Sequence, residues 1–215
     1  MKPEIFLNNK NHSMKSCLKP IALSLIFATA FYSIKVVTTF GVPSAQAQSA
    51  PNSEALTKDW YDYTARDRSY RVKFPAQPIE QNLSADSIIG PLKVVVAVYN
   101  DRTKQRLYVT GSYKYPINPD QYNVEKGLDG ARDKSAQDSD STIIREIKLS
   151  LYGIPGREIM MHSNKNAEAT LMRIFIDPSG PTIYIASVYA ANGNIDFPEA
   201  MAFMNSFAPA VKSSQ

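Results

Sequence analysis

The sequence predicts an α+β fold, in which amphipathic helices lie on a twisted, largely antiparallel β-sheet. Three observations support this class. Beyond about residue 58 the chain shows mostly the two-residue alternation of strands, short turns join these segments as hairpins, and only two segments have helical periodicity. No βαβ rhythm and no internal repeat is visible, so we expect a single domain over residues 59–209.

The first 47 residues are predicted to be a secretory signal peptide. A basic start precedes an uncharged apolar run at 21–34, and Ala45 and Ala47 form the Ala-x-Ala pattern of a cleavage site. The alternative is an uncleaved anchor, which would need about 20 apolar residues and would bury Lys35. Residues 48–58 are expected to form a flexible linker, and 210–215 a C-terminal tail.

The positive charge of the chain is concentrated in this leader. The chain has 24 lysines and arginines against 20 acids; residues 1–47 hold five bases and one acid, which leaves 19 of each in the remainder. A neutral body gives no indication of nucleic-acid binding. Cys17, the only cysteine, is removed with the leader, so no disulfide or thiol chemistry is expected in the mature chain. The pattern favours a bacterial-type extracytoplasmic protein.

One strand and one hairpin are predicted in the first half of the mature chain. Residues 70–74 alternate apolar and basic side chains, which indicates a half-buried strand stopped by the prolines that follow. Residues 94–99 are apolar on both faces, and 107–115 alternate again. The polar turn at 100–104 joins the two as a hairpin.

A helix is predicted after this hairpin. Asn118 is its expected N-cap, with Pro119 in the first helical position. Val124, Leu128 and Ala131 recur on one face and form a narrow apolar stripe.

Four strands are predicted in the second half, at residues 142–152, 157–163, 169–177 and 182–190. A turn over 153–156 joins the first two, and a β-turn over 177–180 joins the last two. In the first of these strands four apolar side chains are in phase, and they are Ile143, Ile147, Leu149 and Leu151.

A short helix is predicted to end the domain. Asp196 is its expected cap, Glu199 completes a capping box, and Pro209 ends the segment. The apolar stripe of this helix consists of Ala200, Phe203, Met204 and Phe207.

The sequence offers few candidates for catalysis or metal binding. The motifs of zinc proteases, nucleophile-elbow hydrolases, P-loops and dinucleotide sites are missing, so no catalytic residue and no cofactor is predicted. His162, the single histidine of the mature chain, is a candidate general base, with a half-exposed strand histidine as the alternative. Asp138 and Asp140 are candidate calcium ligands, with a solvated helix end as the alternative.

Aromatic and basic residues provide a candidate interaction surface. Exposed aromatic patches often mark binding sites, and Tyr108, Tyr113 and Tyr115 lie on one predicted hairpin. Arg66 and Arg68 belong to the one local basic patch and complete this candidate surface. The alternatives are that the tyrosines pack within the sheet, where tyrosine is common, and that the basic residues are a solvated turn and strand face. The members of the basic patch are Arg66, Arg68, Arg71 and Lys73.

Several short motifs resemble the PsbP-like superfamily, over residues 58–208. They are Trp60-Tyr61-x-Tyr63, Tyr70-x-Val-x-Phe-Pro75-x-x-Pro78, Tyr152-Gly-Ile-Pro-Gly156-Arg-Glu158 and Phe203-x-x-Ser206-Phe207. The resemblance implies an α-β-α sandwich around the antiparallel sheet. It also implies a non-catalytic role in assembling larger complexes, such as photosystem II for the founding member, and a location in the periplasm or thylakoid lumen.

The sequence therefore leads to three functional hypotheses. The favoured one is an exported, non-catalytic binding or assembly module that docks on a membrane complex or an envelope protein. Such a module has a protein partner, no nucleic-acid partner and no covalent lipid, and it contacts the membrane only through an uncleaved leader. The alternatives are a carrier of a small apolar ligand between sheet and helix, and a hydrolase that uses His162 or an acidic pair.

Overall fold

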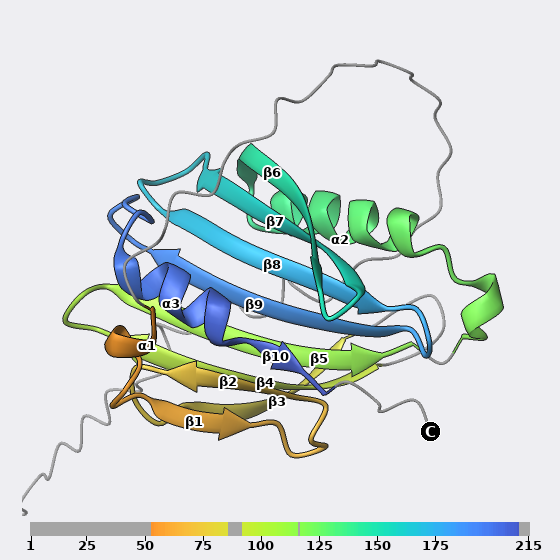
Figure 1. Cartoon of the computed structure of the whole chain (residues 1–215). Helices are drawn as coiled ribbons and strands as arrows, with labels where there is room; N and C mark the ends of the chain where they lie inside the picture. Colours follow the sequence, from red (N-terminus) through yellow and green to blue (C-terminus); the bar gives the residue numbers. More distant parts are fainter. Residues whose placement is uncertain (1–52, 86–91, 116, 211–215) are drawn as a thin grey trace, which may run out of the picture.

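The computed structural model describes residues 53–85, 92–115 and 117–210, and the structural statements that follow concern these residues. A seven-stranded antiparallel sheet forms the centre of the molecule, with its strands in the order β3-β4-β5-β9-β8-β7-β6 (Figure 1). The strands are β3 (Ile79–Ala85), β4 (Leu92–Asp101), β5 (Arg106–Lys114), β6 (Ser141–Leu151), β7 (Ile154–Ser163), β8 (Ala169–Asp177) and β9 (Thr182–Ala190).

Helices cover both faces of this sheet. The helix α2 (Val124–Asp138) packs on one face, against β6, β7 and β8. On the other face lie α1 (Ser53–Leu56), α3 (Pro198–Ser206) and a small antiparallel sheet, ordered β1-β2-β10 (Figure 1). Its strands are β1 (Tyr61–Thr64), β2 (Tyr70–Phe74) and β10 (Ala208–Pro209). The α+β class and the sandwich arrangement are thus as predicted.

The face under α3 has an aromatic core. The ring of Phe203 lies 5.1 Å from that of Phe74 in β2 and 5.2 Å from that of Tyr108 in β5, centre to centre. Phe207 stacks on Tyr70 at 5.2 Å and on Phe175 of β8 at 5.9 Å. Rings at such distances add to the stabilisation that burial of their surface gives. The small sheet, the helix and the large sheet therefore share one core.

The opposite face combines an apolar stripe with an ion network. Leu128 and Ala131 of α2 are buried against the sheet. The side chain of Arg157 in β7 is only 3% exposed; its guanidinium lies 2.6 Å from Glu125 in α2 and 2.9 Å from Glu146 in β6. The hydrogen bond from Arg157 lowers the pKa of the Glu125 carboxyl. Because loss of one partner would leave a buried charge uncompensated, this network fixes α2 on the sheet.

Both predicted helix starts need correction. Asn118 does cap a turn, but a 3₁₀ turn, Pro119–Gln121; α2 begins only at Val124, where Asn123 accepts a hydrogen bond from the Lys126 amide. Helix α3 has Phe197 at its N-cap, with no side-chain cap bond. The predicted capping box is therefore wrong, and Glu199 instead forms ion pairs with β5 and the turn before it, at Arg106 and Lys104.

The β6–β7 hairpin also differs from the prediction. Its turn consists of Tyr152 and Gly153, because Leu151 already pairs with Ile154, so the residues placed in a turn over 153–156 belong mostly to β7. A bulge between Ile143 and Arg145 reverses the phase of β6. Ile143 therefore packs on the α2 face, whereas Leu149 and Leu151 pack on the α3 face.

The remaining elements match or extend the prediction. The β8–β9 hairpin has the predicted bounds, and the stripe of α3 is buried as expected. The described part of the stretch predicted as a linker, 53–58, contains α1. Its first residues, the predicted leader with Ala45 and Ala47, and the tail beyond 210 lie outside the described residues. None of the described helices has both the length and the apolarity to cross a bilayer.

The shared aromatic core gives a first prediction. Replacing Phe203 by Ala should lower the free energy of unfolding by about 3–5 kcal/mol, because the side chain is fully buried and its removal leaves a cavity. Urea unfolding followed by circular dichroism measures the change. The control is Met201→Ala in the same helix, at a partly buried position, which should have a smaller effect. Equal losses in the two variants would contradict a core centred on Phe203.

Candidate interaction surface

The three tyrosines proposed for an interaction surface are core residues. Tyr108, Tyr113 and Tyr115 are 1%, 5% and 4% exposed. Tyr108 packs under α3, and burial raises the pKa of its hydroxyl to about 12. Tyr113 and Tyr115 contact each other on the α2 face, with their ring centres 5.4 Å apart. The expectation of an exposed tyrosine patch is thus corrected: β5 is an inner strand covered on both sides.

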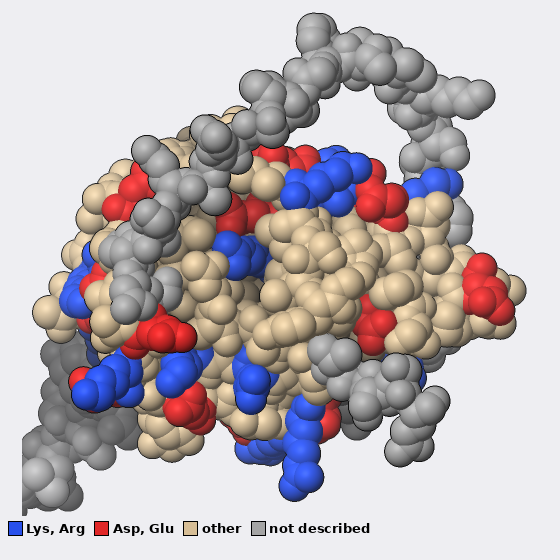
Figure 2. All heavy atoms as spheres, in the orientation of Figure 1, with Lys and Arg blue, Asp and Glu red and all other residues tan. Residues whose placement is uncertain are grey.

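The three arginines of the basic patch, in contrast, are exposed, and Lys73 is half-buried. The members of the patch differ in their partners. Arg66 pairs with Glu80 of β3, a carboxylate that also accepts a 2.8 Å hydrogen bond from the Tyr63 hydroxyl. Lys73 pairs with Asp62 of β1 at 3.2 Å. Figure 2 shows lysine and arginine side chains gathered over the part of this face where β1 and β2 lie.

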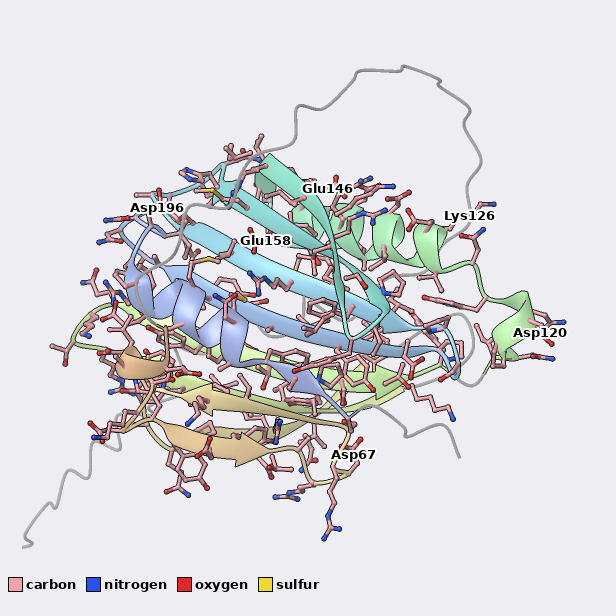
Figure 3. The ribbon with its side chains drawn as sticks, viewed as in Figure 1. Asp67, Asp120, Lys126, Glu146, Glu158 and Asp196 are labelled. Carbon is pink, nitrogen blue, oxygen red and sulfur yellow. The ribbon has the colours of Figure 1, made fainter. Side chains whose placement is uncertain are left out.

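Arg68 and Arg71 have no such partner. Neither guanidinium forms an ion pair with another residue in the described ranges. Asp67, labelled in Figure 3, lies next to Arg68 in the turn between β1 and β2. The carboxylate of Asp67 instead accepts a 3.0 Å hydrogen bond from the Ser69 amide. Two exposed cations are therefore left to be neutralised by solvent ions or by a ligand.

These two arginines line a surface depression of about 480 Å³. Three parts of the fold surround it: the β1–β2 hairpin, the C-terminal strand β10 and the tip of the β6–β7 hairpin. Its floor and rim combine guanidinium groups, phenol rings and small apolar residues. The lining residues are Thr64, Arg68, Tyr70, Arg71, Tyr152, Ala208, Pro209 and Ala210.

Two of the lining residues have a backbone conformation that their side chains disfavour. Arg68 has a φ of 57° and Tyr152 a φ of 53°. This left-handed region costs roughly 1–2 kcal/mol for residues other than glycine, and such outliers gather at functional sites. Tyr152 is also 62% exposed, and Gly153, with a φ of 81°, completes a turn of the type that prefers Asn-Gly. The described residues contain two further cases, Gln105 and Asp140.

His162 and its neighbouring carboxylate do not converge. The histidine lies in β7, half-buried, and its ring makes no hydrogen bond to another described residue. Glu158 is on the same face of the same strand, four residues away, which is about 13 Å. That buried carboxylate is neutralised by Arg173 at 2.8 Å and Arg145 at 3.2 Å, and it lies in the middle of the sheet face (Figure 3).

The candidate calcium ligands have separate partners. The carboxylate of Asp138 pairs with Lys134 one turn earlier in α2. The carboxylate of Asp140 pairs with Lys165 at 3.0 Å and accepts a 3.1 Å hydrogen bond from Asn164. Across the described ranges, no group of three or more histidine, cysteine or acidic side chains lies close enough to hold a metal ion.

Comparison with known proteins supports the fold. No family model matches the chain, and no curated protein does. Among solved structures, the solution structure of cyanobacterial PsbP (CyanoP) from Synechocystis sp. PCC 6803 is similar, with a TM-score of 0.50 and 11% sequence identity, over 70% of this chain and 92% of that one. The chain has a PsbP-like fold. The resemblance inferred from the short motifs is thereby confirmed at the level of the fold.

Within this PsbP-like fold, one side of the depression was predictable from the sequence and the other was not. Arg68 and Arg71 belong to the predicted basic patch, whereas Tyr152 falls at the end of the strand predicted at 142–152. A signal was present in Tyr152-Gly153, since a residue before glycine between two alternating segments indicates a two-residue hairpin turn. A side chain in that position points outward. Nothing local indicated that the turn would meet β10.

The strained turn of the PsbP-like fold gives a second prediction. Tyr152→Asn should raise the free energy of unfolding by about 0.5–1 kcal/mol, because asparagine tolerates the left-handed backbone better than tyrosine does. The control is Tyr61→Asn: Tyr61 is 41% exposed but has no positive φ, so this change should be neutral or destabilising. If both variants lose stability equally, the Tyr152 ring contributes to packing and is not held against a backbone preference.

Proposed function

We propose that the chain is an exported, non-catalytic interaction module that docks on a membrane-associated protein complex through the depression lined by Arg68, Arg71 and Tyr152. Export is supported by the pattern of the first 47 residues, with cleavage proposed after Ala47. A binding role is supported by the resemblance of the short motifs to the PsbP-like superfamily, which implies non-catalytic assembly, and the structure is consistent with it in having a PsbP-like fold. The docking surface itself is inferred from the depression and its charges.

One observation carries the proposal. Arg68 and Tyr152 are far apart in the sequence, yet both have a disfavoured left-handed backbone, and both side chains line the same depression. Asparagine or glycine would suit either turn better. Two of the four described non-glycine residues with this backbone, from turns far apart in the sequence, thus lie at one depression. A contact with a partner provides a physical reason for retaining these residues there.

The chemistry of the depression indicates the kind of partner. A guanidinium binds a carboxylate with two parallel hydrogen bonds. Two lining guanidiniums that have no ion pair with a described residue therefore suit a segment with more than one acidic group. The exposed ring of Tyr152 supplies apolar contact area at a small entropy cost. We infer an acidic segment of a subunit as the docking target. The PsbP-like resemblance makes photosystem II the first complex to test.

The alternative functions have less support from the geometry. A carrier needs an apolar cavity between sheet and helix, but on the α3 face this space is filled by the rings of Phe74, Tyr108 and Phe203. A hydrolase needs a nucleophile, base and acid in mutual reach, and His162 lies about 13 Å along the strand from Glu158. Neither arrangement matches the strained, exposed residues that the docking proposal explains.

Affinity purification from mildly solubilised membranes tests the proposal. The tagged chain should recover a complex at low salt, and the double variant Arg68→Glu/Arg71→Glu should reduce that recovery at least about tenfold, because two charge-assisted hydrogen-bonded contacts become repulsive. The control is Arg102→Glu, an exposed arginine of the β4–β5 turn that also has no ion pair with a described residue. It should leave recovery unchanged.

The outcomes separate the two parts of the proposal. Equal losses with Arg102→Glu would show that general positive charge, and not this depression, drives recovery. Full recovery with the double variant would overturn the docking surface. Mass spectrometry of the recovered subunits decides the partner: a complex without photosystem II subunits would reject that candidate and would leave the docking surface to be mapped on another one.

A further inference from the structure

The outer edge of β6 is an open strand edge. β6 is the last strand of the large sheet, it pairs only with β7, and no described element covers its other side (Figure 1). It is eleven residues long, and most of its side chains are exposed. Ile144 and Ile147 are 56% and 43% exposed, among the few large apolar side chains on the described surface. Such an edge offers unpaired backbone groups to another strand.

The hairpin turn determines which backbone groups point outward. A two-residue turn makes the flanking pair, Leu151 and Ile154, a hydrogen-bonded pair, and the pattern then alternates along the strands. The amide and carbonyl groups of Leu151, Leu149 and Ile147 therefore face β7. Those of Glu146, Lys148 and Ser150 face outward. The bulge at Ile144 ends the regular edge, so a partner strand can pair only with residues beyond it.

The side chains along this edge are complementary to those of a second copy. When two β6 strands pair antiparallel with the axis at Ile147, each Glu146 lies opposite the Lys148 of the other copy, and the two Ile147 side chains meet. Glu146 and Lys148 are also the residues with outward backbone groups, so the same pairs form the new hydrogen bonds. Opposite charges placed in this way stabilise a strand pair, and like charges destabilise it.

The neighbouring registers are unfavourable. In an antiparallel pair, residues whose backbone groups point toward the partner strand must lie opposite one another. The possible positions of the two-fold axis are therefore one residue apart along β6. An axis at Lys148 places two lysines opposite each other, and an axis at Glu146 places two glutamates opposite each other. Among these three registers, the charges favour the one centred on Ile147. A strand of arbitrary sequence from another protein would not match both the charges of Glu146 and Lys148 and the apolar side chain of Ile147 between them.

We propose that β6 is a self-association edge, through which two copies pair antiparallel about a two-fold axis at Ile147 and join their large sheets into one continuous sheet. The interface is isologous, as in most homodimers. Within each copy Glu146 contacts Arg157 and Lys148 contacts Glu125, both on the α2 face, and the pairing places one further opposite charge beside each of them. Ile147 faces the other side of the sheet. The inference does not depend on the proposed docking function.

Disulfide trapping tests the register. In the full chain with Cys17→Ser, Ile147→Cys is the only cysteine, and it lies at a non-hydrogen-bonded pair with Cα atoms about 4.5 Å apart, within disulfide range. Mild oxidation should give a covalent dimer. Lys148→Cys should not cross-link, because its copies lie on a diagonal about 7–8 Å apart. Ile79→Cys, at a 71% exposed position on the opposite edge strand, is the surface control and should stay monomeric.

Sedimentation of the chain without cysteine substitutions provides an independent measurement. Ile147→Lys should lower the association constant at least about tenfold, because two like charges then meet at the axis, while Ile79→Lys should leave it unchanged. Both positions are exposed, and circular dichroism checks that each variant is folded. A chain that stays monomeric at high concentration, equal cross-linking at residues 79 and 147, or faster cross-linking at residue 148 would each overturn the proposal.

Discussion

The aromatic contacts of Phe203 with Phe74 and with Tyr108 are the constraint on which the packing of α3 and the two sheets depends. It joins a terminal helix, a strand of the small sheet and a strand of the large sheet in one buried cluster. With that cluster formed, β2 and β10 can lie only along the α3 face, where Phe207 stacks on Tyr70 and Phe175. The β10 edge of the small sheet and the tip of the β6–β7 hairpin then border the same depression. Core packing therefore determines where the depression lies, and Tyr70 belongs both to the aromatic core and to the lining.

The sequence predicted those parts of the fold whose signals are local. The β8–β9 hairpin was found with correct bounds, because both strands are apolar on both faces and a β-turn sequence separates them. The N-termini of both helices were misplaced, because more than one nearby residue has a side chain that can cap a helix. Asn118 caps a 3₁₀ turn and Asn123 caps α2. Helix α3 begins after Phe197 without a side-chain cap bond, so Asp196 is not its cap. Nothing in the alternation of β6 indicated its bulge. Burial of Tyr108 depended on which strands flank β5, and alternation does not contain that information.

The charged residues also show that some properties follow from the sequence alone, while others depend on the tertiary structure. The body of the chain is neutral, but its charges are used unequally. Arg157 is buried among carboxylates and fixes α2, and Arg173 neutralises the buried Glu158. Arg68 and Arg71, in contrast, have no ion pair with a described residue. Composition predicted a balance for the whole body, whereas the placement of each carboxylate determines which cations remain available to a ligand. The candidate site follows from that placement.

The two-residue turn at Tyr152 and Gly153 connects both inferences about this protein. Its left-handed backbone places an exposed ring at the rim of the depression. The same turn fixes the register of β6 against β7, and so determines that Ile147 lies opposite Glu158 on the α3 face while Glu146 and Lys148 face α2. A shift of one residue would exchange these faces and would place Ile147 against the α2 ion network. The register of β6 therefore fixes the position of the turn, and the side chain of Tyr152 is the part of the turn that the proposed docking surface would use.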